Sequence, residues 1–139
     1  MSRFVLDASV SLAWFLDRPV PHLAVQIWRG LQQGSRAIVP SLWATEIANG
    51  FATAERRGSL TKLHIDRCLT DVEILLASAI DHSASVISIR QALGVASAFR
   101  LTAYDAIYLE TARREQLPLA TLDRALIEAA AAAGVPLFA

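Results

Sequence analysis

Short apolar runs alternate with longer amphipathic segments along this chain, and the alternation constrains the fold more than any other feature. The runs cover residues 4–6, 37–39, 117–122 and 135–138. The first two lack the polar alternation of a strand with one exposed face, so they predict strands buried on both faces. The first and third runs lead directly into Asp7 and Asp123.

The segments between the runs predict helices, because their apolar residues recur at helical spacing. Glycine follows three of these segments, as it commonly does at the end of a helix. The predicted helices cover residues 8–17, 22–33, 41–57, 61–79, 84–99, 102–115 and 124–133, and a weaker pattern near residues 79–80 allows one further short strand. Such alternation predicts an α/β fold: a central parallel sheet of four or five strands, flanked by helices on both faces.

Length and composition narrow the class of protein. One core can fill a chain of 139 residues, and no linker divides it, so we expect a single domain over residues 1–139. The 13 basic and 13 acidic residues cancel, which argues against a general polyanion binder working by bulk charge. Cys68 is the only cysteine, which fits a reducing compartment. No apolar stretch approaches the ~18 residues of a membrane span, and we expect a cytoplasmic protein without membrane association.

Four acidic residues stand where an α/β fold would bring them together. Ligands bind open parallel sheets at the carboxyl ends of the strands, and Asp7 and Asp123 stand where two predicted strands end. Glu46 lies early in the helix after the second strand, and Asp105 lies at the start of the helix opened by Thr102. We therefore expect the four carboxylates to converge on one cleft.

Each of these residues also has a purely structural interpretation. Asp7 and Asp123 precede helices, where an aspartate cap stabilises by about 1 kcal/mol. Asp105 follows Thr102 at the spacing of a capping box. Glu46 sits among apolar residues, where its alternative role is a surface salt bridge. A buried carboxylate without a partner is costly, so Glu46 needs water, a partner or a cation.

Carboxylates gathered in one cleft repel one another, and a divalent cation removes that penalty. Ligation by oxygen alone favours Mg²⁺ or Mn²⁺ over zinc, which prefers histidine or cysteine. Such an ion can activate water and stabilise the charge of a phosphoryl transition state. The sequence therefore predicts metal-dependent hydrolysis of phosphodiester bonds.

Four segments resemble the acidic motifs of PIN domains and occur in the same order. They are Val5-Leu6-Asp7-Ala8-Ser9, residues 40–49, residues 101–112 and residues 117–126. The elements Tyr104-Asp105-Ala106 and Ala120-Thr121-Leu122-Asp123 are the most specific. The resemblance covers nearly the whole chain, although residues 60–100 carry no family signature.

The resemblance implies a PIN-like domain, and the size is similar to that of the VapC toxins of type II toxin–antitoxin pairs. It implies a Mg²⁺- or Mn²⁺-dependent endoribonuclease that cleaves RNA, forms a homodimer and is neutralised by a VapB-like antitoxin. Asp7 and Asp105 would be the principal metal ligands, with Glu46 and Asp123 completing the catalytic set directly or through waters. Ser9 and Thr121 match polar positions that support the site in the family.

Two other functions remain open. One is a PIN-fold RNA-processing nuclease without an antitoxin, which the lack of a small antitoxin gene immediately upstream would indicate. The other is a catalytically silent interaction module, since a fold does not guarantee activity; the intact set of four acids argues against it. Trp43 and Phe51 flank Glu46 and are expected in the core, with a partner-binding groove as the alternative.

Overall fold

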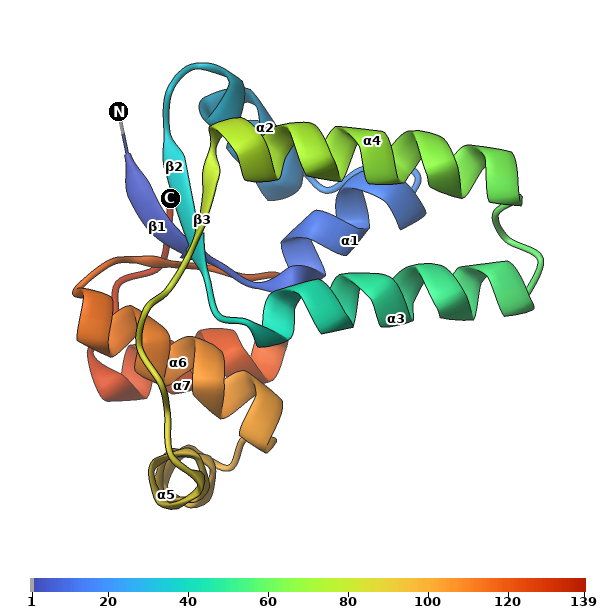
Figure 1. Cartoon of the computed structure of the whole chain (residues 1–139). Coiled ribbons are helices and arrows are strands. Elements are labelled where there is room, and N and C mark those ends of the chain that lie inside the picture. Colours follow the sequence, from blue (N-terminus) through green and yellow to red (C-terminus); the bar gives the residue numbers. More distant parts are fainter. Residues whose placement is uncertain (1) are drawn as a thin grey trace.

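Strands and helices alternate along the computed structural model, which describes residues 2–139 (Figure 1). The strands are β1 (Arg3–Leu6), β2 (Arg36–Val39), β3 (Ile80–His82) and β4 (Leu119–Ala120). The helices are α1 (Ala8–Leu16), α2 (His22–Gln32), α3 (Leu42–Arg56), α4 (Lys62–Ser78), α5 (Ile89–Phe99), α6 (Ala103–Glu115) and α7 (Arg124–Ala133). The predicted α/β class is confirmed.

The strands form one parallel sheet in the order β3-β2-β1-β4. In the centre of this sheet, β1 pairs with β2 on one side and with β4 on the other. Phe4, Val5 and Leu6 are completely buried, as expected for a strand that is covered on both faces. The weaker pattern near residues 79–80 corresponds to β3, so the sheet of four or five predicted strands has four.

The two C-terminal apolar runs form less strand than their lengths predict. Only Leu119 and Ala120 are strand residues in the run 117–122, where Pro118 has no amide hydrogen to donate to a neighbour. The run 135–138 does not form a strand. Its residue Leu137 makes an isolated parallel β-bridge to Leu119. The Phe138 amide still donates to the Leu119 carbonyl at 2.9 Å, which closes this edge of the sheet.

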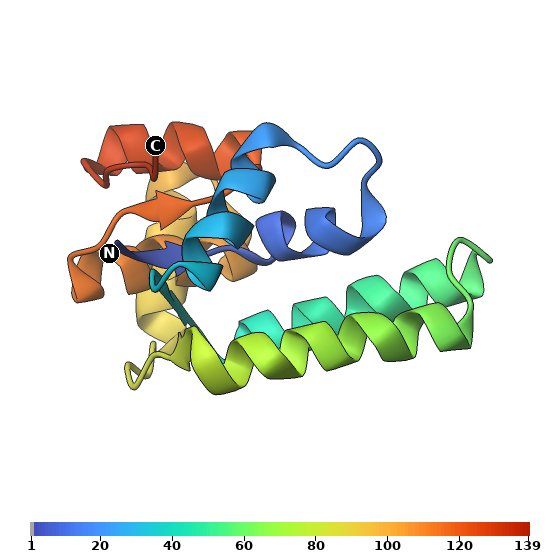
Figure 2. The same ribbon diagram turned by 90° about the horizontal axis from the view of Figure 1, so that it is seen from above.

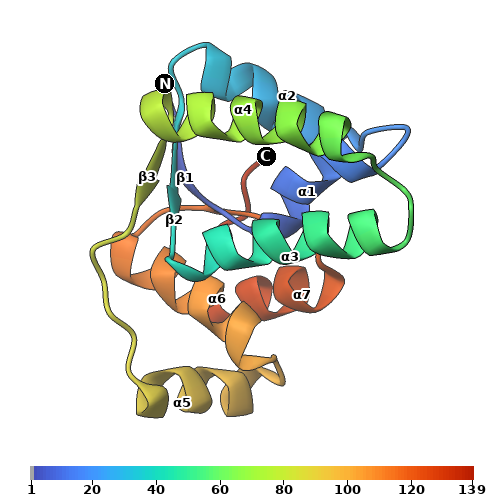
Figure 3. The ribbon, with the colours of Figure 1, turned by 45° about the vertical axis from the view of Figure 1, so that its right-hand side comes forward.

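Helices cover both sides of the sheet. Figures 1 and 3 place α2 and α4 on one side of the strands and α6 and α7 on the other, with α5 outside α6. Seen from above, β1 and β4 lie between α7 and α4 (Figure 2). No helix within residues 2–139 has the length and apolar character needed to span a membrane.

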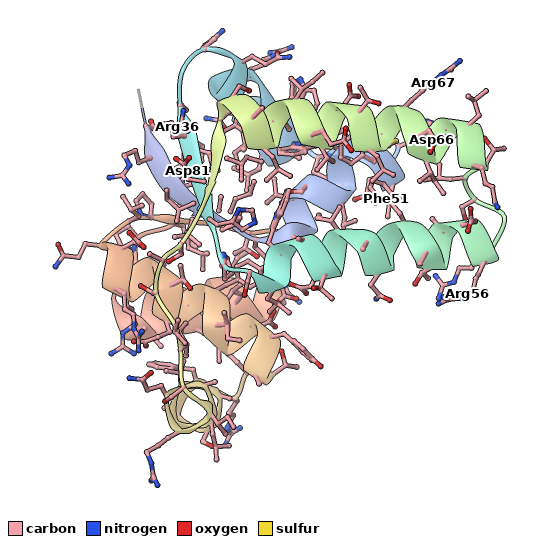
Figure 4. The ribbon with its side chains drawn as sticks, viewed as in Figure 1. Arg36, Phe51, Arg56, Asp66, Arg67 and Asp81 are labelled. Carbon is pink, nitrogen blue, oxygen red and sulfur yellow. The ribbon has the colours of Figure 1, made fainter. Side chains whose placement is uncertain are left out.

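Helix α3 follows β2 and is fixed against α1. The Trp43 indole Nε1 donates to the Ser11 Oγ at 3.1 Å. At Gly50 a Cβ atom would clash with the Leu12 side chain, so glycine permits the close approach of the two helices. Trp43 and Phe51 are buried, and Phe51 lies between α3 and α4 (Figure 4). The core interpretation of these two residues is confirmed, and the partner-groove alternative is wrong.

The predicted helix over residues 84–99 is wrong in its first residues, because α5 begins at Ile89. Ser88 and Gln91 form a reciprocal capping box that sets this start. The preceding residues are held to α6 instead, where the Ser83 hydroxyl donates to the Glu115 carboxylate at 2.9 Å. Local periodicity does not reveal such long-range contacts.

Candidate active site

Asp7 and Asp123 lie at the same edge of the sheet because β1 and β4 are adjacent and parallel. Asp7 directly follows β1, and its amide donates to the Ala120 carbonyl at 2.9 Å. Asp123 follows β4 and occupies the first position before α7. Glu46 comes to this edge from α3 and Asp105 from α6. We call these four carboxylates the acidic cluster.

Two hydroxyl groups hold the Asp7 carboxylate, and both donate to the same oxygen. The Ser9 Oγ lies 2.6 Å from Asp7 Oδ2, and the Thr121 Oγ1 lies 2.7 Å from it. Backbone amides fix the direction of these bonds, because Leu122 N–H donates to the Ser9 hydroxyl and Asp123 N–H to the Thr121 hydroxyl. Neither hydroxyl donates to Asp7 Oδ1, so this is the oxygen that the two hydroxyls leave available to a ligand.

Burial sets the electrostatics of Asp7. Its side chain is only 4% exposed, and burial is the main reason that its pKa is raised. The hydroxyl groups of Ser9 and Thr121 oppose this effect, and the Asp123 carboxylate adds to it. The charged form of Asp7 is therefore destabilised in the absence of a cation.

Asp105 responds to every other member of the acidic cluster. Its pKa is raised to about 6, first by partial burial and then by the charges of Asp123, Asp7 and Glu46. Nearby negative charges can have this effect only when the four carboxylates are close in space. The structure thus brings together four acidic residues that lie far apart in the sequence.

Glu46 is held by Tyr108, a residue outside the predicted set of site residues. The Tyr108 hydroxyl donates to Glu46 Oε1 at 2.7 Å, and the Tyr108 side chain is completely buried. Burial is the main cause of the raised pKa of Glu46, with a smaller contribution from Asp7 and an opposing one from the tyrosine. One sequence signal was available, because Tyr108 stands three residues after Asp105 and shares its face of α6.

Of the three aspartates that could serve as helix caps, only one does so. Asp123 Oδ2 accepts the Leu126 amide at 2.9 Å, so Asp123 does cap α7. Asp7 precedes α1 without making such a bond. At α6 the cap is Thr102, whose hydroxyl accepts the Asp105 amide at 3.1 Å. Capping therefore accounts for one oxygen of Asp123 and for neither of the other two carboxylates.

Basic side chains do not neutralise the acidic cluster. Within residues 2–139 the ion pairs join Arg36 to Asp81, and Arg113 and Arg114 to Glu110. Figure 4 shows Arg36 beside Asp81 at β2 and β3. The salt-bridge alternative for Glu46 is wrong, since its partner is the Tyr108 phenol. The cluster thus gathers negative charge that no basic side chain in the described part of the chain pairs with.

The donor set fits a hard divalent cation. All four candidate ligands offer carboxylate oxygens, which suit Mg²⁺ and Mn²⁺. Across residues 2–139, no three His, Cys, Asp or Glu side chains form a group that could hold an ion by themselves. Mg²⁺ does not need such a cage, because it commonly binds through one or two carboxylates and retains several waters.

A cavity lies away from the acidic cluster, at the end of α1 where Trp14 and Phe15 stand. This cavity of about 630 Å³ is lined by aromatic and basic side chains from α1, α2 and α4, among them Trp14, Trp28 and Arg67. Its lining includes none of the four clustered carboxylates. The charge pattern, and not cavity size, therefore identifies the candidate active site.

Comparison with known proteins gives a consistent result for the fold. The family model described as PIN domain matches residues 4–132. The crystal structure of PAE2754 from Pyrobaculum aerophilum matches with a TM-score of 0.69 at 23% identity, over 92% of this chain and 84% of that one. FitAcB from Neisseria gonorrhoeae matches with a TM-score of 0.62 at 17% identity, over 98% and 96% of the two chains. No curated protein sequence matches this chain.

Proposed function

Because this chain belongs to the PIN domain family, whose members are generally nucleases, we propose that it is a Mg²⁺- or Mn²⁺-dependent endoribonuclease. The observation that carries the proposal is the acidic cluster, in which four carboxylates meet at one edge of the sheet and form no ion pair with a basic side chain of residues 2–139. A site of this kind favours a divalent cation and, through it, a phosphodiester substrate.

Each residue of the candidate site has a role in this proposal. Asp7 and Asp105 would hold the ion, with Glu46 and Asp123 completing the catalytic set directly or through waters. The bound ion would supply an acidified water as nucleophile and stabilise the charge of the phosphoryl transition state. Ser9 and Thr121 support Asp7, because their hydroxyls occupy Oδ2 and hold the carboxylate in one orientation.

RNA is the proposed substrate, although the formal net charge of the chain is zero. Lys62 is the only lysine, so almost all of the 13 basic residues are arginines. Arginine suits phosphate because its planar guanidinium can form two parallel hydrogen bonds. Locally placed arginines and a bound cation would therefore attract the substrate in place of a high net charge.

The biological role that we propose is that of a VapC-like toxin, which forms a homodimer and is neutralised by a VapB-like antitoxin. Exposed apolar side chains support the existence of protein partners. Ile89 is 89% exposed and Leu93 is 63% exposed, and the two lie one turn apart on α5. Val86, just before this helix, is 87% exposed.

The central test compares RNA cleavage by variants of the acidic cluster. Asp7→Asn and Asp105→Asn should each abolish the cleavage that Mg²⁺ or Mn²⁺ supports, because each removes a charge that the cation needs. Asp66→Asn is the matched control, since Asp66 is exposed on α4 and lies outside the cluster. RNA fragments made by each protein are sequenced. Cleavage at the rate of the unaltered protein by Asp7→Asn would contradict the proposed mechanism.

The toxin role has a separate test. Expression of the unaltered protein should arrest growth, and Asp105→Asn should not. Co-expression of the product of a small adjoining gene should restore growth if that product is the antitoxin. Cleavage of RNA without growth arrest would instead indicate an RNA-processing nuclease.

A further inference from the structure

The Tyr108 hydroxyl is a buried polar group that donates to a member of the acidic cluster. Tyr108 is completely buried in α6, and its phenol lies 2.7 Å from Oε1 of Glu46 in α3. A phenol has one proton to donate, and here that proton is committed to the carboxylate. Hydrogen bonds to an ionised acceptor are shorter and stronger than neutral ones.

This hydrogen bond joins two elements that are otherwise held by different neighbours. Helix α3 is fixed to α1 through Trp43 and Ser11. Helix α6 packs beside β1 and α5 and carries Asp105. Figure 3 shows the start of α3 close to α6. The bond from Tyr108 to Glu46 is the hydrogen bond between α3 and α6 in the described part of the chain.

Glu46 alone would be free to move, because its side chain has three rotatable bonds and is only half-buried. Tyr108 has no such freedom, since it is enclosed by the core. A rigid donor that reaches a flexible carboxylate determines where that carboxylate lies. The same tyrosine is three residues from Asp105, so it relates Glu46 directly to the helix that bears another proposed ligand.

We propose that Tyr108 is a positioning residue for the metal site: its hydroxyl fixes Glu46 Oε1 and leaves Oε2 for the cation or its waters. The inference rests on the proposed function and adds to it a residue outside the four acids. It also distinguishes the two oxygens of Glu46, as Ser9 and Thr121 distinguish those of Asp7. Outer partners of this kind commonly alter metal affinity by about 10- to 100-fold when removed.

A double-mutant cycle on the full chain tests the inference, with Mn²⁺ affinity measured by calorimetry and RNA cleavage measured in parallel. Tyr108→Phe should weaken Mn²⁺ binding about tenfold or more. Tyr104→Phe is the matched control, because it removes a phenol from the same helix at a side chain that is 61% exposed. In a Glu46→Gln background, Tyr108→Phe should have no further effect, since the carboxylate that it positions is gone.

Glu46→Asp provides an independent variant that leaves the core tyrosine intact. It keeps the negative charge but withdraws the carboxylate from the phenol by one methylene, so Mn²⁺ affinity should fall as it does for Tyr108→Phe. Thermal melts without metal verify that each variant is folded.

The outcomes separate this inference from the proposed function. Unchanged Mn²⁺ affinity in folded Tyr108→Phe, or an equal loss with and without Glu46, would overturn the positioning role while leaving the nuclease intact. Failure of the unaltered protein to bind Mn²⁺ would overturn the proposed function, and the positioning role with it.

Discussion

Asp7 shows how a single side chain can be stabilised by hydrogen bonds and still be destabilised in its charged form. Two hydroxyls donate to one of its oxygens, yet burial raises its pKa. The position of this residue after an apolar run was sufficient to predict that it lies at the carboxyl end of a strand. Tyr108 was not predictable in the same way, because its role depends on the approach of α3 to α6, which no local pattern encodes.

Asp105 should make the stability of the metal-free protein depend on pH. Its pKa is about 6 in the folded protein, above the ordinary value of 3.8. The stability that this group contributes is therefore fully present below about pH 3.8 and is lost as the pH rises through about 6. Asp105→Asn should abolish this loss of stability at high pH. At pH 7.5 without metal it should raise the free energy of unfolding by about 1 kcal/mol, because solvent screening limits the effect.

The measurement is urea unfolding of both proteins at pH 4 and pH 7.5 without metal. The stabilisation by Asp105→Asn should be greater at the higher pH. Asp66→Asn, on the exposed surface of α4, is the control for loss of one acidic charge. Equal effects of Asp105→Asn at the two pH values would show that neither burial nor the other carboxylates raise the pKa of Asp105.

At the scale of elements, helix ends were predicted well where a local signal specifies them. Gly134 adopts a positive φ of 72° after α7, as expected for a glycine that ends a helix. The start of α5 was predicted too early, because the segment before it is held by Glu115 of α6. The length of β4 was predicted less well: it has only two residues, and Pro118, which precedes it, has no amide hydrogen to donate.

Asp123 has a structural role in α7 besides its proposed catalytic one, and two substitutions separate them. Asparagine caps a helix about as well as aspartate, whereas alanine does not. Asp123→Ala should lower the free energy of unfolding by about 1 kcal/mol, because the Leu126 amide loses its acceptor. Asp123→Asn should retain most of that stability while losing nuclease activity. Chemical denaturation and RNA cleavage of both variants test this division.

Gly94 offers a stabilising substitution within α5. It lies in the helix interior with an ordinary negative φ, and an added Cβ would meet no atom within 4 Å. Gly94→Ala should raise the free energy of unfolding by about 0.5–1 kcal/mol, because alanine loses less backbone entropy on folding. Gly58→Ala is an informative comparison, since its φ of +72° should make the same change destabilising. A stability loss in Gly94→Ala would show that this face of α5 is covered.

For the whole molecule, the alternation of short apolar runs with amphipathic segments was sufficient to predict a parallel α/β sheet. Buried strands and amphipathic helices can be told apart because their apolar residues recur with different periods. The strand order was not predictable, since it depends on which crossovers place β4 beside β1. The convergence of the acidic cluster follows from that order. The sequence thus predicted the four carboxylates of the candidate site and the supporting Ser9 and Thr121, but not the Tyr108 hydroxyl or the backbone amides that complete the hydrogen bonding.

Metal binding should stabilise the whole molecule. A cation that binds only the folded state at a hundredfold excess over its Kd adds about 2.7 kcal/mol to the free energy of unfolding. The gain from Mg²⁺ or Mn²⁺ should be larger at pH 7.5 than at pH 5, because Asp105 with its pKa of about 6 must release its proton. Thermal melts measure this gain, which Asp7→Asn should reduce. A melting temperature unmoved by millimolar metal would count against the site.

The pairing of β1 with β4 also determines when the site can exist during synthesis. The Thr121 hydroxyl that orients Asp7 is separated from it by 114 residues of sequence. Asp7 is made before all seven of the described helices, whereas Thr121 and Asp123 follow six of them. An incomplete nascent chain therefore carries its first carboxylate without the strand that holds it. The acidic cluster can therefore assemble only after β4 has been made and has paired with β1.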